Sequence, residues 1–193
     1  MIRIAEEADI SAMLAIYAPY VLTSTATFEY TVPSEEEFAC RFREITRQYP
    51  LLVWEEEGQI LGYAYASAPY TRAAYAWCAE PSINLRPDAR GRKIGTALYR
   101  VLEKILEKQG YHVLYALVTA ENLESVAFHE KFCYQKQAFF PDCGVKFGRW
   151  IGIYWMEKRL KTVEIPTQFP VVWKSIGEIG EICHDILGTL SLS

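Results

Sequence analysis

Three observations predict that this chain folds as a single mixed α/β domain. Short apolar, β-prone segments alternate along the chain with segments that carry apolar residues at helical spacing. A basic loop with two glycines leads from the end of one such strand directly into an amphipathic helix. The 193 residues, 51% hydrophobic and 23% charged, suit one globular domain with a short extension. We therefore expect a mixed sheet flanked by helices over residues 1–161, and a helical C-terminal extension over residues 162–193.

The N-terminal half contains a local signal for each expected element. Asp9 is expected to cap a first helix. Ser34 and Glu37 have the spacing of a capping box and predict the start of a second. Glu57 and Gly58 form a turn between two β-prone segments. The expected elements are a strand at 2–5, helices at 10–22 and 35–47, and strands at 51–56 and 60–66.

The C-terminal half continues the alternation of strands and helices. Its expected elements are a strand at 77–85, a helix ending at 110, a strand at 113–118, a helix at 122–132, and strands at 134–140 and 145–159. Beyond them, Pro166 and Pro170 mark a linker. Apolar residues from Trp173 to Leu190 then fall at helical spacing, although three glycines weaken that helix. Its apolar face needs cover, from the domain or from a second subunit.

The loop before the central helix has the features of a phosphate-binding site. A helix start presents unpaired N–H groups and the positive end of the helix dipole, and glycines let a ligand approach the backbone. The natural ligand is a phosphate or pyrophosphate, although an ordinary strand-to-helix turn has the same appearance. Neither the P-loop order of residues nor the dinucleotide-binding order is present. The expected binding residues are Arg90, Gly91, Arg92, Lys93, Ile94, Gly95 and Thr96.

Two motifs, in this order and with a strand between them, resemble those of the GNAT acetyltransferase superfamily. Arg90 and Gly95 fill the ends of the pattern Gln/Arg-x-x-Gly-x-Gly/Ala, and Lys93 stands at its middle glycine. Lys93 can still donate its backbone N–H there if its φ is negative. The second pattern is Asn-x-x-Ala/Ser-x-x-x-Tyr-x-x-x-Gly-Phe. Its polar positions hold Asn122, Ser125 and His129, and Cys133-Tyr134 replaces Gly-Phe.

The resemblance extends to the phosphinothricin or methionine sulfoximine N-acetyltransferase branch and covers about residues 1–160. It is carried by the opening segments at 2–4, 16–17 and 24–28, by residues 73–82, and by Lys146 to Trp150. It implies a sheet whose two central parallel strands splay apart to admit acetyl-CoA. It also implies an acetyl-CoA-dependent N-acetyltransferase for a small amino-acid-like amine, and a homodimer. A protein or peptide N-acetyltransferase and a non-catalytic CoA-binding module are the alternatives.

Transfer of an acetyl group to an amine needs a base, polarisation of the thioester oxygen and a proton for the thiolate. By resemblance the base is Glu80, and the alternative is a solvated glutamate at a strand end. His129 could protonate the thiolate, or could be structural. Asn122 and Ser125 are expected to bind the cofactor, or to cap a helix. Ile83, Asn84 and Leu85 are expected to pair with pantetheine as an added strand does, with the Leu85 N–H donating to the acetyl carbonyl.

Phe28, Tyr30, Arg72 and Tyr75 are expected to select the substrate, with Arg72 holding a carboxylate. Simple core packing is the alternative for the aromatic residues. Phe147 stands where some members of the branch have a histidine with a catalytic role. Because this chain has no histidine at that position, Glu80 is the main candidate for the catalytic base.

Composition excludes several classes of function. A net charge of −4 argues against nucleic acid as a main partner. No apolar run approaches the ~20 residues of a membrane span, and the N-terminus lacks the apolar segment of a signal peptide, so a cytoplasmic protein is expected. The five cysteines are scattered, with no Cys-x-x-Cys pair, so neither a metal nor a disulfide framework is expected.

Overall fold

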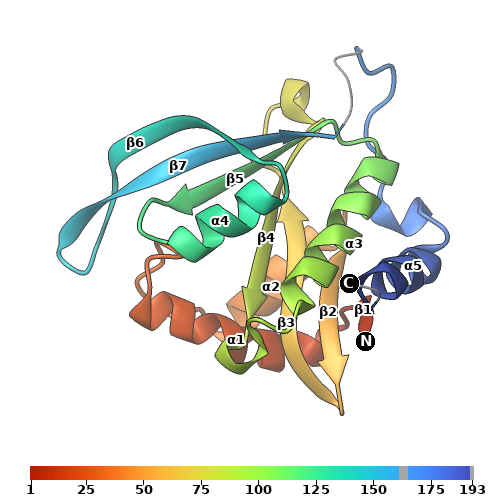
Figure 1. The fold of residues 1–193 in the computed structure, drawn as a ribbon, viewed down its shortest axis with the longest axis horizontal. Coiled ribbons are helices and arrows are strands. Elements are labelled where there is room, and N and C mark those ends of the chain that lie inside the picture. The colour runs from red at the N-terminus through yellow and green to blue at the C-terminus, as the bar shows by residue number, and fades with distance from the viewer. Residues whose placement is uncertain (161–164, 192–193) are drawn as a thin grey trace.

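The computed structural model describes residues 1–160 and 165–191. This part of the chain forms a seven-stranded sheet of order β1-β2-β3-β4-β5-β7-β6, with helices against it (Figure 1). The strands are β1 Ile2–Ile4, β2 Leu51–Glu56, β3 Gln59–Ser67, β4 Cys78–Leu85, β5 Val113–Thr119, β6 Gln135–Lys146 and β7 Arg149–Arg159. The helices are α1 Ile10–Thr23, α2 Glu35–Ile45, α3 Ile94–Gln109, α4 Leu123–Lys131 and α5 Ile179–Ser191. The predicted mixed α/β fold is confirmed.

The two central strands, β4 and β5, separate soon after they begin. They pair in parallel at Cys78 with Val113 and at Ala79 with Leu114, and no further. In Figure 1 they leave this meeting point in different directions, so the sheet opens like a V. From Glu80 to Leu85 only the β3 side of β4 is paired. The splayed parallel pair expected from the resemblance is therefore present, and one edge of β4 faces the opening.

Alternation along the strands builds a core on each face of the sheet. Leu52 and Ala64 pack with the apolar face of α3, whereas Val53 and Tyr63 pack with α1 and α2 on the other side. The fully buried Leu98 shows how α3 contributes to the first core. Burial of each large apolar side chain contributes about 1.5–3 kcal/mol, so this packing holds both walls of the opening in place.

Two local predictions are wrong in an instructive way. Asp9 precedes α1 but makes no capping hydrogen bond to it, because its carboxylate accepts instead from Arg3 and from the Glu6 N–H. The sequence predicts that one strand ends at 140 and the next begins at 145, yet β6 continues without a turn to Lys146. Pro141 to Cys143, which resemble a turn in the sequence, lie within a shift of strand register between Phe140 and Gly144. The capping box of Ser34 and Glu37 is confirmed.

The C-terminal extension packs against the domain. Instead of one helix from Trp173, it has a 3-10 turn at Trp173–Ser175 and then α5, separated by Gly177 and by Glu178 at a φ of 64°. Ile182 of α5 is buried in the same core as α3. The sequence left open whether the domain or a second subunit covers the apolar face of this segment. The domain itself covers the part that contains Ile182. The expected boundary between residues 161 and 162 lies outside the described residues.

Candidate active site

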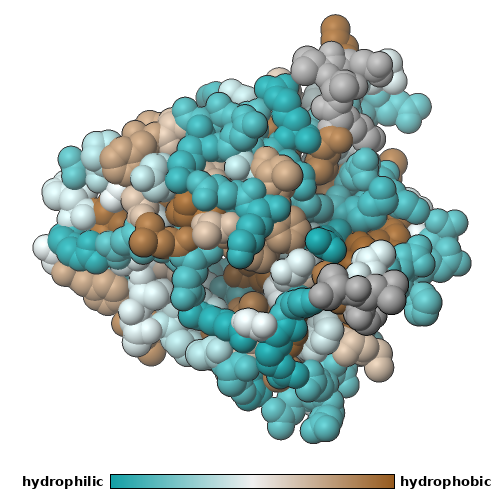
Figure 2. Space-filling model, viewed as in Figure 1, coloured by the Kyte–Doolittle hydropathy of each residue, from teal (hydrophilic) through white to brown (hydrophobic). Residues whose placement is uncertain are grey.

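A cleft of about 600 Å³ occupies the opening between β4 and β5. Its walls come from α1, β4, the loop before α3, the first turn of α3, β5 and α4. Figure 2 shows a hollow on this face, with apolar residues inside and hydrophilic residues around its rim. The cleft brings together most of the predicted site residues: Glu80, Ile83, Asn84, Leu85, Arg90, Gly91, Lys93, Ile94, Gly95, Thr96, Asn122, Ser125 and His129.

The loop before α3 owes its shape to two residues in the left-handed conformation. Gly91 has a φ of 74°, which glycine adopts without steric cost. Lys93, the N-cap of α3, has a φ of 62°, so the negative φ considered for it is not adopted. Its side chain makes no capping hydrogen bond, and the first turn of α3 contains no acidic residue. The positive end of the helix dipole is thus presented at the cleft.

Gly95 permits the close contact between this first turn and β4. A Cβ built on Gly95 would lie 3.0 Å from Leu85 Cδ1 and 3.4 Å from Ile83 Cδ1. A Cβ here would require the Leu85 side chain to shift by a few tenths of an ångström, so glycine suits the close packing of α3 on β4.

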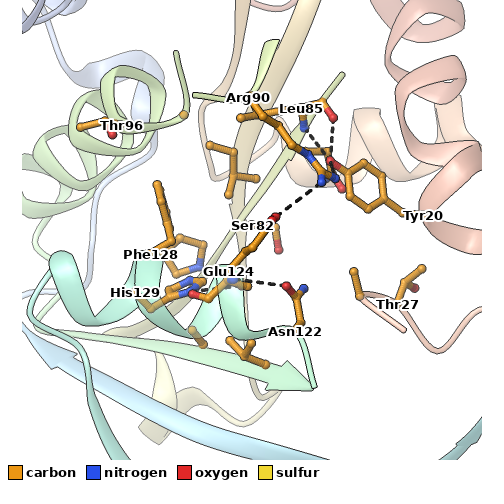
Figure 3. A pocket seen from close by; sticks show the side chains of 18 of the residues that line it. Tyr20, Thr27, Ser82, Leu85, Arg90, Thr96, Asn122, Glu124, Phe128 and His129 are labelled. Atoms are coloured by element: carbon orange, nitrogen blue, oxygen red, sulfur yellow. Dashed lines mark hydrogen bonds and ion pairs between the residues drawn. The ribbon is translucent and has the colours of Figure 1, made fainter. Parts of the chain in front are cut away.

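The basic residues of the loop point in different directions. Arg90 reaches across the cleft, where its guanidinium donates to the Tyr20 hydroxyl over 3.2 Å and lies 3.5 Å from the Glu124 carboxylate of α4 (Figure 3). Arg92 turns outward, where one guanidinium nitrogen donates to both carboxylate oxygens of Glu56, and it does not line the cleft.

The free edge of β4 is partly occupied by a side chain. The Tyr20 hydroxyl donates to the Leu85 carbonyl over 2.6 Å and accepts from the Leu85 N–H over 3.2 Å. The backbone donor expected to face an acetyl carbonyl is therefore engaged by α1. Figure 3 shows Tyr20, Leu85 and Arg90 together at one side of the cleft.

Glu80 lies just beyond the point where β4 leaves β5. It is half-buried, and burial raises the pKa of its carboxyl above the ordinary value. Since a raised pKa makes a carboxylate a stronger base, this position combines access to the cleft with improved proton affinity.

His129 is buried at the opposite wall. Its Nδ1 lies 2.8 Å from the Ser125 carbonyl, which can only accept, so Nδ1 carries the proton. Burial lowers the pKa of the imidazole, and the ring packs edge-on against Tyr99 and Tyr134. The residue is thus a neutral imidazole held among aromatic rings.

Asn122 and Ser125 both border the cleft, and they also bond each other. The Asn122 side chain accepts from the Ser125 N–H over 3.2 Å, which makes Asn122 the N-cap of α4. The capping alternative for Asn122 is therefore realised, in a position that also faces the cleft.

The four residues expected to select the substrate lie outside this cleft. Phe28 packs over Gly144 of β6, and the Tyr30 hydroxyl donates to the Val145 carbonyl. Tyr75 packs against Tyr70, with ring centroids 4.4 Å apart. Arg72 is exposed just before the short 3-10 turn Ala73–Tyr75.

Several cleft residues were not anticipated from the sequence. Tyr17 and Tyr20 lie three positions apart on α1, and this spacing within a predicted helix was the available signal that they share a face. Nothing local marks the others as cleft residues; among them are Thr27, Tyr65, Glu124 and Phe128.

No group of three or more His, Cys, Asp or Glu side chains suited to a metal ion occurs within the described ranges. Among the same residues, no helix is both long enough and apolar enough to span a membrane.

Comparison with known proteins agrees with this geometry. The model of the acetyltransferase (GNAT) domain matches residues 2–155. A phosphinothricin N-acetyltransferase of Alcaligenes faecalis is 34% identical over 161 residues, 82% of each chain. An L-methionine sulfoximine/L-methionine sulfone acetyltransferase of Salmonella typhimurium is 31% identical over 160 residues, 82% of this chain and 94% of the relative.

A solved structure is similar over nearly the whole fold. It is a GNAT superfamily phosphinothricin acetyltransferase of Sinorhizobium meliloti in complex with AcCoA. It is 36% identical, has a TM-score of 0.84, and the match covers 90% of this chain and 97% of that one. The chain belongs to the GNAT superfamily and is an N-acetyltransferase that resembles the phosphinothricin and methionine sulfoximine acetyltransferases.

Proposed function

We propose that this enzyme transfers the acetyl group of acetyl-CoA directly to the amine of a small amino-acid-like substrate of the phosphinothricin or methionine sulfoximine type. One observation carries the proposal: the half-buried carboxylate of Glu80, with its raised pKa, shares a cleft with the N-terminus of α3. A base and an anion-binding helix start in one opening are what such a transfer requires.

The cleft has suitable groups for each part of the donor. The loop from Arg90 to Thr96 would hold the pyrophosphate, through the α3 dipole and the Arg90 guanidinium. The unpaired edge of β4 at Ile83 would pair with the pantetheine amides, and Leu85 would join it once Tyr20 moves aside. Acetyl-CoA supplies the activated acetyl group as a thioester.

The proposed roles follow from position and protonation. Glu80 would take a proton from the attacking amine, directly or through a water molecule. The C–S bond of the thioester would break as the C–N bond forms, and the CoA thiolate would take its proton from water. The Leu85 N–H donates to the acetyl oxygen. For His129 the structural alternative fits better, because a neutral ring whose Nδ1 proton is already donated is poorly suited to supply a proton. Its ring, which packs edge-on against Tyr99 of α3 and against Tyr134, would hold α4 at the cleft wall.

We also propose that the enzyme is a homodimer. The β6–β7 hairpin extends away from the body of the molecule in Figure 1. It carries large apolar side chains that are about half exposed or more: Phe139, Phe140, Phe147 and Trp150. A second subunit would cover them. Light scattering at micromolar concentration tests this: a mass twice 22.2 kDa is expected, and a mass of 22.2 kDa would contradict it.

The activity is tested by following release of the CoA thiol from acetyl-CoA in the presence of single amines. The panel contains proteinogenic amino acids, methionine sulfoximine, phosphinothricin and a short peptide with a free N-terminus. Release with one of the small amines is expected. Release with the peptide alone would favour a peptide N-acetyltransferase. Binding of acetyl-CoA in calorimetry without release by any amine would favour a non-catalytic CoA-binding module.

A further inference from the structure

Lys146, the last residue of β6, is a buried lysine that is only 2% exposed. Within the described residues no carboxylate forms an ion pair with it. The Glu29 carboxylate acts on it electrostatically, but Glu29 is already paired with Arg41 across 2.5 Å. Desolvation lowers the pKa of the Lys146 ammonium group, and Glu29 opposes that shift only in part. A lysine here therefore costs free energy that an apolar residue of similar length would not.

The buried ammonium group bonds backbone in place of an acid. Its Nζ donates to the carbonyl oxygens of Ser24 and Thr27, over 2.7 Å in each case. Both residues lie in the loop between α1 and α2, 122 and 119 positions away in the sequence. One side chain of the β6–β7 hairpin thus fixes the course of this loop at two points.

The same loop makes further contacts with the hairpin. The Thr25 hydroxyl donates to the Glu121 carboxylate over 2.7 Å, and Glu121 forms a bidentate pair with Arg149 of β7. The contacts of Phe28 and Tyr30 described above are with β6. Lys146 differs from these contacts because its two bonds enclose the part of the loop that reaches the cleft.

That part of the loop forms one wall of the cleft. Ala26 and Thr27 line the cleft, and the Thr27 hydroxyl bonds the Tyr17 hydroxyl over 2.9 Å. Figure 3 shows Thr27 and His129 on opposite sides of the cleft. The groups proposed to hold acetyl-CoA lie on β4 and in the segment from Arg90 to Thr96. The wall at Thr27 is therefore available to the acceptor.

We propose that Lys146 is a positioning residue for the acceptor amine: by bonding the carbonyl groups of Ser24 and Thr27, it holds this wall where the acceptor binds. The proposal rests on the proposed N-acetyltransferase function and adds to it a residue that does not itself line the cleft. The wall would contact the acceptor both before and during transfer. Its displacement should therefore weaken ground state and transition state alike, so that the KM for the amine rises while kcat changes little.

The test replaces Lys146 with methionine, which keeps the length of the side chain and removes its donors. Lys146→Met should raise the KM for the best amine of the panel by about 10-fold or more, since two bonds from a charged donor are lost. Both kcat and the calorimetric affinity for acetyl-CoA should stay within about 2-fold of the unmodified values. An unchanged amine KM would overturn the proposal, as would a loss of kcat or of acetyl-CoA affinity as large as the rise in KM.

Lys136→Met is the matched control. It makes the same substitution on the same strand, at a side chain that is 40% exposed and paired with Glu130 at the surface. Because exposed ion pairs contribute little, it should leave the amine KM, kcat and acetyl-CoA affinity unchanged.

A second variant decides the matter if Lys146→Met does not fold. Thr25→Val removes the hydroxyl bond to Glu121 from the same loop and leaves the pair between Glu121 and Arg149 intact. It should raise the amine KM by a few-fold, with kcat and acetyl-CoA affinity again unchanged. An unchanged amine KM in this variant would then overturn the proposal.

Hydrogen exchange separates the positioning role from the activity on which it rests. Amides of residues 24–30 should exchange faster in Lys146→Met than in the unmodified enzyme or in Lys136→Met, whether or not any amine is acetylated. If no amine releases thiol with the unmodified enzyme, the proposed function fails, and the exchange rates still decide whether Lys146 holds the loop. Thiol release with an unchanged amine KM and unchanged exchange in Lys146→Met would leave the function standing and overturn the positioning role.

Discussion

The hydroxyl of Tyr20 is bonded to both polar backbone groups of Leu85, donating to its carbonyl over 2.6 Å and accepting from its N–H over 3.2 Å. The same hydroxyl accepts from Arg90 over 3.2 Å. A side chain of α1 thus engages the edge of β4 and the anion-binding loop together. Both are positions that the donor would need.

Tyr20→Phe is expected to strengthen binding of acetyl-CoA by several-fold, up to about 10-fold. The cofactor would no longer displace hydrogen bonds that contribute about 0.5–1.5 kcal/mol each. Isothermal calorimetry at fixed salt measures the effect. A 10-fold loss of affinity would show instead that the hydroxyl contacts the bound cofactor.

Lys93 adopts a left-handed backbone that is costly for any residue with a Cβ. Lys93→Gly should therefore be more stable than Lys93→Ala by about 1 kcal/mol, since both remove the side chain and only glycine relieves the backbone. Urea unfolding of the two variants gives the comparison. Equal midpoints, or a more stable alanine variant, would contradict the strained conformation.

Glu80→Gln should be more stable than the unmodified enzyme at neutral pH. Because burial raises the folded-state pKa of Glu80 above its unfolded value, the folded state binds the proton more tightly. The unmodified enzyme therefore loses stability as pH rises from the unfolded-state pKa of Glu80 to its folded-state pKa. A glutamine at this position does not titrate and does not lose this stability.

The stability difference between the two proteins should be largest at neutral pH and shrink as pH falls towards the ordinary carboxyl pKa. Urea unfolding between about pH 4 and pH 7 follows it. Glu44→Gln, at an exposed position of α2, serves as the control and should show little change. A difference that grows as pH falls would reverse the sign and contradict a raised pKa.

Trp173 connects the C-terminal extension to the domain. Its indole donates to the Thr46 carbonyl over 2.8 Å, and its ring packs on the core that contains α3. Trp173→Ala should cost about 2–4 kcal/mol in unfolding free energy, since it removes a large, partly buried ring and a partly buried hydrogen bond. Ile165→Ala, at a side chain that is 92% exposed, should change it by less than ~0.5 kcal/mol. Equal effects would show that the extension adds no stability through Trp173.

Local signals in the sequence were sufficient for much of the fold. The capping box at Ser34, the strand–loop–helix unit before α3 and the meeting of β4 with β5 all depend on residues that are close in sequence or belong to recognised motifs. Most of the predicted cofactor residues also share the cleft, because one loop and two strand ends contribute them.

The remaining features depend on contacts between distant segments. Tyr20 and Leu85 are 65 positions apart, and no periodic pattern in the sequence predicts that the Tyr20 side chain bonds the Leu85 backbone. Phe28 and Tyr30 pack against the β6–β7 hairpin, more than 100 positions away. The register shift near Pro141 shows the same limit, since a proline, an aspartate and a glycine indicate a turn unless the partner strand is known.

The central claim is that Glu80 removes the proton from the acceptor amine. It is tested by the turnover of Glu80→Gln with acetyl-CoA and the best amine of the panel, together with the calorimetric affinity for acetyl-CoA. The account predicts that kcat falls by about 10²–10⁴-fold while that affinity stays nearly unchanged. A variant that turns over at the unmodified rate from about pH 6 to pH 9 would contradict it.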